Sequence, residues 1–231
     1  MVADGAGYNS WNAASMYQGR WDASTGKSTQ VWEGPHWVAF GCSTHPLNTS
    51  ATQTGTGRQD AGLIYDPAKA WDRAHGYAWL RSGATDSAAA ATALSTATKT
   101  FNNAINWSDL DQPLGPTLAE MAKAAGKAVG VVTTVPWSHA TPAGLANAHN
   151  VSRKNLAELA NAMLAGEVLD VIMGAGNPDY DDNGEPRKVP GDYPSVGGSE
   201  TWRAIEEARA RPAGTYQGFR PLSTLAEFQA G

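Results

Sequence analysis

The sequence is short of cysteine and of long apolar runs, and each shortage excludes a class of structure. Its single cysteine, Cys42, excludes an intrachain disulfide and any site in which several cysteines bind a metal. No run of about 18 apolar residues occurs, so no segment is predicted to cross a membrane as a helix. The first ten residues lack the basic and apolar regions of a signal peptide. These features fit a cytosolic protein, and equally an exported protein without disulfides.

Charge of one sign and large aliphatic side chains are scarce as well. The 231 residues include 17 Lys and Arg against 22 Asp and Glu, and this mild acidity without a basic run argues against a nucleic-acid partner. Leu, Ile, Val and Phe together number 34, fewer than the 40 alanines. Because large aliphatic side chains supply most of the free energy of burial, we expect a thin core. Nine Trp and seven Tyr still indicate a folded protein, either one large domain or a piece of a larger one.

The second half of the chain alternates between helical and strand patterns. Three helices and two short strands are predicted, the helices over 117–125, 152–165 and 199–211 and the strands over 129–135 and 168–174. Thr117 and Glu120 form a capping-box pattern at the start of the first helix. The expected inner faces of the first two helices are Leu118, Met121, Ala122 and Ala125, and Leu156, Leu159, Ala160 and Met163.

This order predicts an α/β fold with parallel strands joined by crossover helices. Neither strand alternates between apolar and polar residues, so both faces of each are expected to be covered. Functional sites in such sheets gather beyond the carboxyl ends of the strands. Asp4 follows an expected strand stub at 1–3, and His139 and Thr141 follow the strand at 129–135.

Residues 8–80 differ from the rest in composition. They hold six of the nine Trp, few aliphatic residues and many Gly, Ser, Thr and Asn. A helix is predicted near 10–18, followed by irregular structure and short strands. Two interpretations remain open, a face on which sugars stack and a loop-rich region packed by large aromatic side chains, and the second is favoured.

Residues 84–105, ATDSAAAATALSTATKTFNNAI, predict an alanine-rich helix that opens with Asp86 and Ser87. One interpretation is capping, because Asp and Ser are preferred at helix N-termini and a carboxylate suits the positive end of the helix dipole. The other is a serine nucleophile beside a metal-binding carboxylate, at a helix end that can hold an anion. This stretch alone favours capping.

Arg153 adds a basic group to this set. It is expected to open the helix at 152–165, where a cation opposes the helix dipole, and a nearby anion would account for that mismatch. Two carboxylates, a serine, a histidine, a threonine and an arginine are thereby predicted near one sheet edge. Phosphoryl transfer uses these residue types, as oxygen ligands for metal ions, as a nucleophile and as a guanidinium that binds phosphate oxygens.

Four stretches together resemble the alkaline phosphatase family. They are VADGAG, TDSAAAATALSTATKTFNNAI, KAVGVVTTVPWSHATPAGLANAHNVSR and LDVIMGAGNPDYDDNGEP, in the order of the family. The resemblance implies a three-layer αβα fold with a mostly parallel central sheet, here incomplete. Residues 1–231 would form a single partial domain, with 8–80 as a Trp-rich variable region within it.

The resemblance also implies roles for individual residues. Ser87 would be the nucleophile and Arg153 would bind two phosphate oxygens. Asp4 would bridge a zinc and the magnesium, and Asp86 would bind the same zinc. Thr141 would be a magnesium ligand, with His139 as a ligand or a neighbour of one.

The implied activity is hydrolysis of a small-molecule phosphomonoester through a phosphoserine intermediate, with two Zn²⁺ and one Mg²⁺. The family's habits imply a periplasmic or extracellular location, no nucleic-acid or membrane partner, and leave a homodimer of the full-length enzyme open. All five histidines precede residue 150, so the family's further zinc ligands are absent. We therefore expect an N-terminal portion of a longer enzyme, inactive alone. The alternatives are a phosphodiesterase or another member of the same metalloenzyme superfamily, and a non-catalytic binding module.

Overall fold

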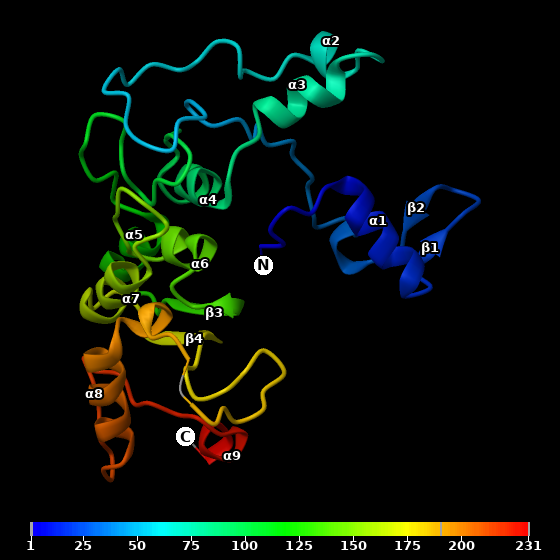
Figure 1. Cartoon of the computed structure of the whole chain (residues 1–231). Helices are drawn as coiled ribbons and strands as arrows, with labels where there is room; N and C mark the ends of the chain where they lie inside the picture. The colour runs from blue at the N-terminus through cyan, green and yellow to red at the C-terminus, as the bar shows by residue number, and fades with distance from the viewer. Residues whose placement is uncertain (1, 190, 231) are drawn as a thin grey trace. The chain divides into compact units, whose positions relative to one another are not determined.

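The computed structural model describes residues 2–189 and 191–230. The chain forms two compact units, Met1–Ser43 and Thr44–Gly231, whose elements are labelled in Figure 1. The division falls inside the Trp-rich region at 8–80. Each unit is described separately below.

The first unit is small and built from local contacts. It contains α1 (Tyr8–Tyr17), the antiparallel strands β1 (Trp21–Asp22) and β2 (Lys27–Ser28), and the 3₁₀ helix η1 (Val31–Glu33). The helix predicted near 10–18 is confirmed. The strand stub predicted at 1–3 is wrong at Val2 and Ala3, because the N–H of Ala6 donates to the carbonyl of Ala3 and closes a turn. Met1 lies outside the described residues.

The second unit carries the remaining elements. Its helices and strands are α2 (Pro67–Ala70), α3 (Gly76–Ser82), α4 (Ser87–Thr96), α5 (Leu118–Ala124), β3 (Gly130–Pro136), α6 (Ala140–Leu145), α7 (Leu156–Ala165), β4 (Val171–Ala175), η2 (Pro194–Val196), α8 (Ser199–Arg209) and α9 (Leu225–Ala230). Strands β3 and β4 are parallel, with Val131 opposite Ile172. The predicted α/β class and parallel pair are confirmed, and the three-layer arrangement stays a prediction.

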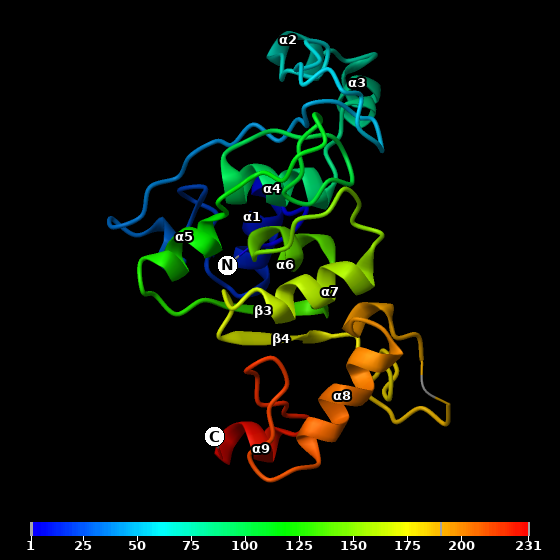
Figure 2. The same cartoon turned by 90° about the vertical axis from the view of Figure 1, so that its left-hand side faces the viewer.

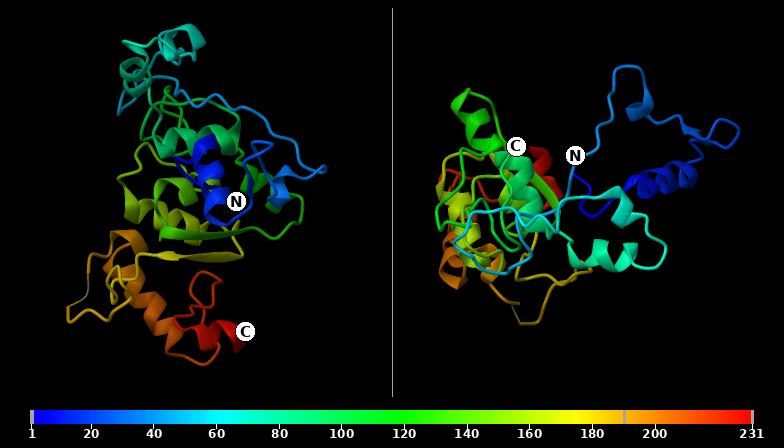
Figure 3. Two further views of the ribbon diagram at one scale, coloured as in Figure 1. Left: turned by 90° about the vertical axis from the view of Figure 1, so that its right-hand side faces the viewer. Right: turned by 90° about the horizontal axis from the view of Figure 1, so that it is seen from above.

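Within the second unit, the described residues cover one face of the two strands, whereas the sequence predicted cover on both faces. Val131 and Ile172 pack against the core that α6 and α7 complete (Figure 2). On the other face Val132 is 71% exposed and Met173 is 42% exposed. Figure 3 shows the strands side by side, with α8 extending away from them. The apolar residues of both faces reflect composition, whereas burial depends on which elements pack against each face.

Small residues let α4 and α6 approach closely. Ala88 and Ala143 are fully buried, and a Cβ added to Gly144 would lie 2.8 Å from the Cβ of Ala91. The alanine content therefore serves close helix packing. Larger apolar side chains come from α7, where Leu159 and Met163 are fully buried as predicted.

Two helix predictions need correction. The helix predicted over 84–105 ends at Thr96, because Ala97 adopts a left-handed conformation with φ 56° and the chain turns away. The capping box of Thr117 and Glu120 is confirmed at α5, but the predicted inner face of that helix is wrong.

Helix α5 meets the rest of the unit through polar contacts. Leu118 and Met121 are 60% and 46% exposed. Glu120 Oε1 lies 3.0 Å from His149 Nε2, and Lys123 Nζ lies 2.7 Å from Asp170 Oδ1. These polar residues, with the buried Ala119, form the inner face instead.

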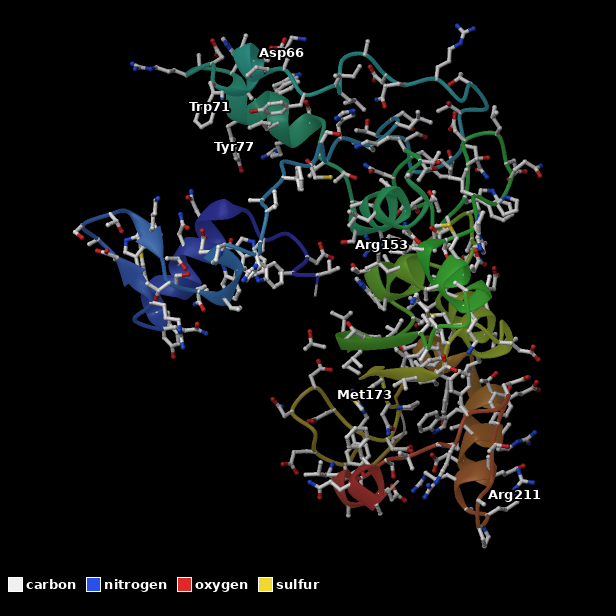
Figure 4. The ribbon with its side chains drawn as sticks, turned by 180° about the vertical axis from the view of Figure 1, so that it is seen from behind. Asp66, Trp71, Tyr77, Arg153, Met173 and Arg211 are labelled. Atoms are coloured by element: carbon white, nitrogen blue, oxygen red, sulfur yellow. The ribbon has the colours of Figure 1, made fainter. Side chains whose placement is uncertain are left out.

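Two aromatic side chains beside α2 and in α3 lie largely at the surface. Trp71 is 82% exposed and Tyr77 is 78% exposed (Figure 4). Tyr65 and Trp79 do pack, with ring centroids 6.4 Å apart. The favoured interpretation, a region packed by its aromatics, is thus wrong for Trp71 and Tyr77. Among the described residues, no helix has the length and apolar content to cross a bilayer.

Candidate active site

The centre of the candidate site is an ion pair between Asp86 and Arg153. Arg153 Nη1 donates to Asp86 Oδ2 at 3.1 Å, and the two side chains are 22% and 23% exposed. Asp86 is also the N-cap of α4, because its Oδ1 accepts from the N–H of Ala89 at 2.9 Å. Partial burial reduces screening by solvent, so this pair is held more firmly than a surface ion pair.

Ser87 is the first residue of α4 and follows this cap directly. The first turn of a helix presents N–H groups that have no partner within the helix, and the helix dipole makes this end positive. Both interpretations of the Asp86–Ser87 pair therefore meet at one place. Asp86 caps the helix and contacts the Arg153 guanidinium, and Ser87 is the next residue, at a helix end that suits an anion.

His139 contacts the same guanidinium from another helix. It occupies the N-cap position of α6, and its Nε2 lies 3.2 Å from Arg153 Nη2. A guanidinium only donates hydrogen bonds, so Nε2 accepts and a neutral ring carries its hydrogen on Nδ1. Arg153 thus joins the residues that precede α4 and α6, and Figure 4 shows it beside these helices. Thr141 lies in the first turn of α6, two residues beyond His139.

Arg153 itself lies before a helix, which corrects the predicted start at 152. Helix α7 begins at Leu156, and the preceding residues form a turn. The side chain of Asn150 accepts from the N–H of Ser152, and the hydroxyl of Ser152 accepts from the N–H of Lys154. These local bonds compete with helix formation. The argument from a cation that opposes the dipole of this helix therefore fails.

Two asparagines that the sequence analysis overlooked also contact Asp86. The N–H of Asp86 donates to Asn102 Oδ1 at 3.1 Å, and the N–H of Asn103 donates to Asp86 Oδ2 at 3.1 Å. Two consecutive asparagines could have predicted a turn here, because asparagine is enriched in turns and tolerates left-handed backbone conformations.

Among the described residues, no group of three or more His, Cys, Asp and Glu is placed to hold a metal. Asp86 Oδ2 and His139 Nε2 both face Arg153, and a catalytic zinc usually has three protein ligands. These side chains alone therefore do not fit a zinc site. Asp4 belongs to the first unit, so its part in such a site stays a prediction.

Comparison with known proteins identifies the family. The family model described as alkaline phosphatase matches residues 68–202. The chain belongs to the alkaline phosphatase family. The match includes Asp86, Ser87, His139, Thr141 and Arg153.

Individual alkaline phosphatases are similar to part of the chain. Alkaline phosphatase 4 of Bacillus subtilis is 44% identical over 97 residues, which cover 40% of this chain and 21% of the relative. The enzyme of Escherichia coli is 54% identical over 70 residues, or 30% of this chain and 14% of the relative. The alkaline phosphatase structure of Thermus thermophilus aligns with a TM-score of 0.51 and 27% identity, covering 80% of this chain and 32% of that one. The chain thus spans about a fifth or less of the length of these curated relatives.

Proposed function

We propose that the chain carries the nucleophile and the phosphate-binding arginine of a phosphomonoester hydrolase that acts through a phosphoserine. The single observation that supports this most is the bond from Arg153 to Asp86, the cap of the helix that Ser87 opens. This bond directs a guanidinium to a helix N-terminus that begins with a hydroxyl. The family membership supports the same chemistry.

The proposed binding mode follows from the donors available. A guanidinium has five N–H groups, and the described contacts with Asp86 and His139 use one each. Others would bind oxygens of a phosphoryl group that sits against the first turn of α4. The same donors would stabilise negative charge in the transition state.

The proposed reaction has two displacements. The Oγ of Ser87 forms a bond to phosphorus as the bond to the leaving alcohol breaks. Water then attacks the phosphoserine, which releases phosphate and restores the serine. Holding the phosphoryl group beside Ser87 raises the effective concentration of the nucleophile.

The two Zn²⁺ and one Mg²⁺ are expected from the resemblance alone. Asp4, Asp86, Thr141 and His139 are the proposed ligands in this chain, and they do not complete a site by themselves. The short span relative to the curated relatives supports further ligands from sequence outside these 231 residues. A periplasmic or extracellular location, a small phosphomonoester substrate and a homodimer are proposed on the same basis.

Hydrolysis of p-nitrophenyl phosphate by the full-length enzyme, with zinc and magnesium added, tests the proposal. After prolonged incubation, acid quenching and digestion, mass spectrometry should find phosphate on Ser87, and Ser87→Ala should lack both the label and any turnover. Label on another residue, or turnover that survives Ser87→Ala, would contradict the proposal. Bis(p-nitrophenyl) phosphate and a panel of glycans test the phosphodiesterase and binding-module alternatives.

A further inference from the structure

The turn at Asn102 and Asn103 touches both members of the central ion pair. Asn102 Oδ1 accepts from the N–H of Asp86, and the N–H of Asn103 donates to Asp86 Oδ2, each at 3.1 Å. The carbonyl of Asn103 accepts from the N–H of Arg153 at 2.7 Å. One dipeptide therefore bonds to the cap of α4 and to the backbone of the arginine.

The backbone that follows this turn holds the arginine segment in register. Ile105 and Asn150 form an antiparallel bridge, with the N–H of Ile105 donating to Asn150 O at 2.9 Å and the reverse bond at 2.8 Å. Ile105 is fully buried, so the bridge is anchored in the core. Together with the bond from the N–H of Arg153 to Asn103 O, this bridge fixes the backbone of Arg153 relative to the core.

The conformation of Asn103 makes these bonds available. Its φ is 74°, in the left-handed region that most side chains avoid and asparagine tolerates. The side-chain amides add links on either side, from Asn102 Nδ2 to Ala84 O and from Asn103 Nδ2 to Ala51 O, each at 3.4 Å. A residue that disfavours positive φ would turn the peptide groups of 103 away from Asp86 and Arg153.

We propose that the Asn102–Asn103 turn is the positioning element of the phosphate site. It fixes the spacing between the Arg153 guanidinium and the N-terminus of α4, so that both contact one phosphoryl group. This inference rests on the proposed function for its ligand. Neither asparagine contacts the reacting atoms of the proposed reaction, and both act through Asp86 and Arg153. A misplacement of about 1 Å at such a site lowers rate by roughly 100-fold.

Substitutions at the turn separate positioning from simple stability. Asn103→Gly retains access to positive φ, whereas Asn103→Val does not. Asn102→Ala removes the acceptor for the N–H of Asp86 and leaves the backbone of 103 unchanged. Asn161→Ala is a matched control. Asn161 lies on α7, outside the site, and its side-chain amide donates to Gly197 O at 3.0 Å.

Two readouts are taken on the ¹⁵N-labelled 231-residue chain. The first is the heteronuclear NOE of the Arg153 Nε–Hε group, assigned by its loss in Arg153→Lys. The second is the dissociation constant of inorganic phosphate from NMR titration. Asn103→Val and Asn102→Ala should lower the NOE and weaken phosphate binding about tenfold, while Asn103→Gly stays within about twofold of wild type. Asn161→Ala should lower the melting temperature and leave both readouts unchanged.

The outcomes distinguish the two proposals. If Arg153→Lys and the turn variants all bind phosphate like the wild type, the phosphate site itself is wrong. If Arg153→Lys weakens binding but the turn variants match wild type in both readouts, the positioning role is wrong. Should the wild-type chain fail to bind phosphate, the proposed function loses its support, and the NOE still decides whether the turn immobilises Arg153.

Discussion

The ring of His139 accepts a hydrogen bond from Arg153, with 3.2 Å between Nε2 and Nη2. The lone pair used in this bond is the one that Nε2 would offer to a metal. In the metal-free chain we therefore expect His139 to affect phosphate binding through the arginine.

His139→Ala tests that role. Loss of the acceptor should weaken phosphate binding by about 1 kcal/mol, the usual contribution of one hydrogen bond. Phosphate titration of the metal-free chain measures it, with the exposed His75→Ala as the control. Unchanged phosphate binding together with lost zinc or magnesium binding would instead make His139 a metal ligand.

Arg153→Ala should weaken phosphate binding by about 1.5–3 kcal/mol, the contribution of a hydrogen bond to a charged group. Isothermal titration with inorganic phosphate gives the value. Arg203→Ala is the matched control, because its guanidinium is exposed on α8 and pairs only loosely, at 3.7 Å, with Glu207. Equal affinity of the Arg153 and Arg203 variants would give Arg153 a purely structural role.

Gly144→Ala should destabilise the fold by about 1–3 kcal/mol, since the new Cβ would lie 2.8 Å from the Cβ of Ala91 and force α4 and α6 apart. The measurement is urea unfolding. Gly7→Ala is the control, because a Cβ there meets nothing within 4 Å. If both variants unfold at the wild-type midpoint, α4 and α6 are not packed as closely as the 2.8 Å contact at Gly144 indicates.

The stability of the second unit should fall in acid through Asp109. Burial raises the pKa of this carboxyl. The N–H groups of Thr54 and Gly57 and the hydroxyl of Thr54 lower the pKa by more than burial raises it, so the net pKa lies below the ordinary 3.8. A group with a depressed folded-state pKa stabilises the fold above its unfolded pKa, and that stability is lost as pH falls through the folded value.

Asp109→Asn should therefore destabilise the chain at neutral pH by about 1–3 kcal/mol. The difference from wild type should shrink as pH drops below about 4. Unfolding midpoints between pH 3 and pH 7 decide this. A difference that is constant over the whole range would show that ionisation of Asp109 is irrelevant to stability.

The 231 residues alone should bind zinc weakly, since the described side chains complete no metal site. Little phosphatase turnover is expected for the same reason. The exposed apolar face of β3 and β4, with Val132 at 71%, should also promote association. Equilibrium dialysis against zinc and light scattering test these expectations. Tight zinc binding by a monodisperse sample would mean that other residues complete the site.

Local signals were predicted well from the sequence. The capping box of Thr117 and Glu120 and the helix cap at Asp86 depend on residues within a few positions, so pattern alone identified them. The parallel pairing of β3 and β4 followed from the order of elements. The contact between Asp86 and Arg153 was foreseen only coarsely, as a shared sheet edge and through the family resemblance, because nothing local connects residues so far apart.

Long-range contacts explain what was missed. The roles of Asn102 and Asn103 depend on bonds to Asp86 and Arg153 and on the left-handed conformation of Asn103, which lies beyond the end of α4. The exposed face of Val132 depends on what packs there, which strand composition does not encode. The helix predicted from residue 152 begins only at Leu156, because the side chains of Asn150 and Ser152 bond to nearby backbone N–H groups and stabilise a turn.

Mapping where phosphate binds decides whether Arg153 and the N-terminus of α4 form one phosphate site. Titration of inorganic phosphate into the ¹⁵N-labelled chain should shift the amide signals of Ser87 and Ala88 and the Arg153 Nε signal together, with one dissociation constant. Arg153→Ala should raise this dissociation constant by about 10- to 150-fold, and Ser87→Ala should retain the shifts. Shifts confined to other residues, or an unchanged dissociation constant in Arg153→Ala, would contradict this binding mode.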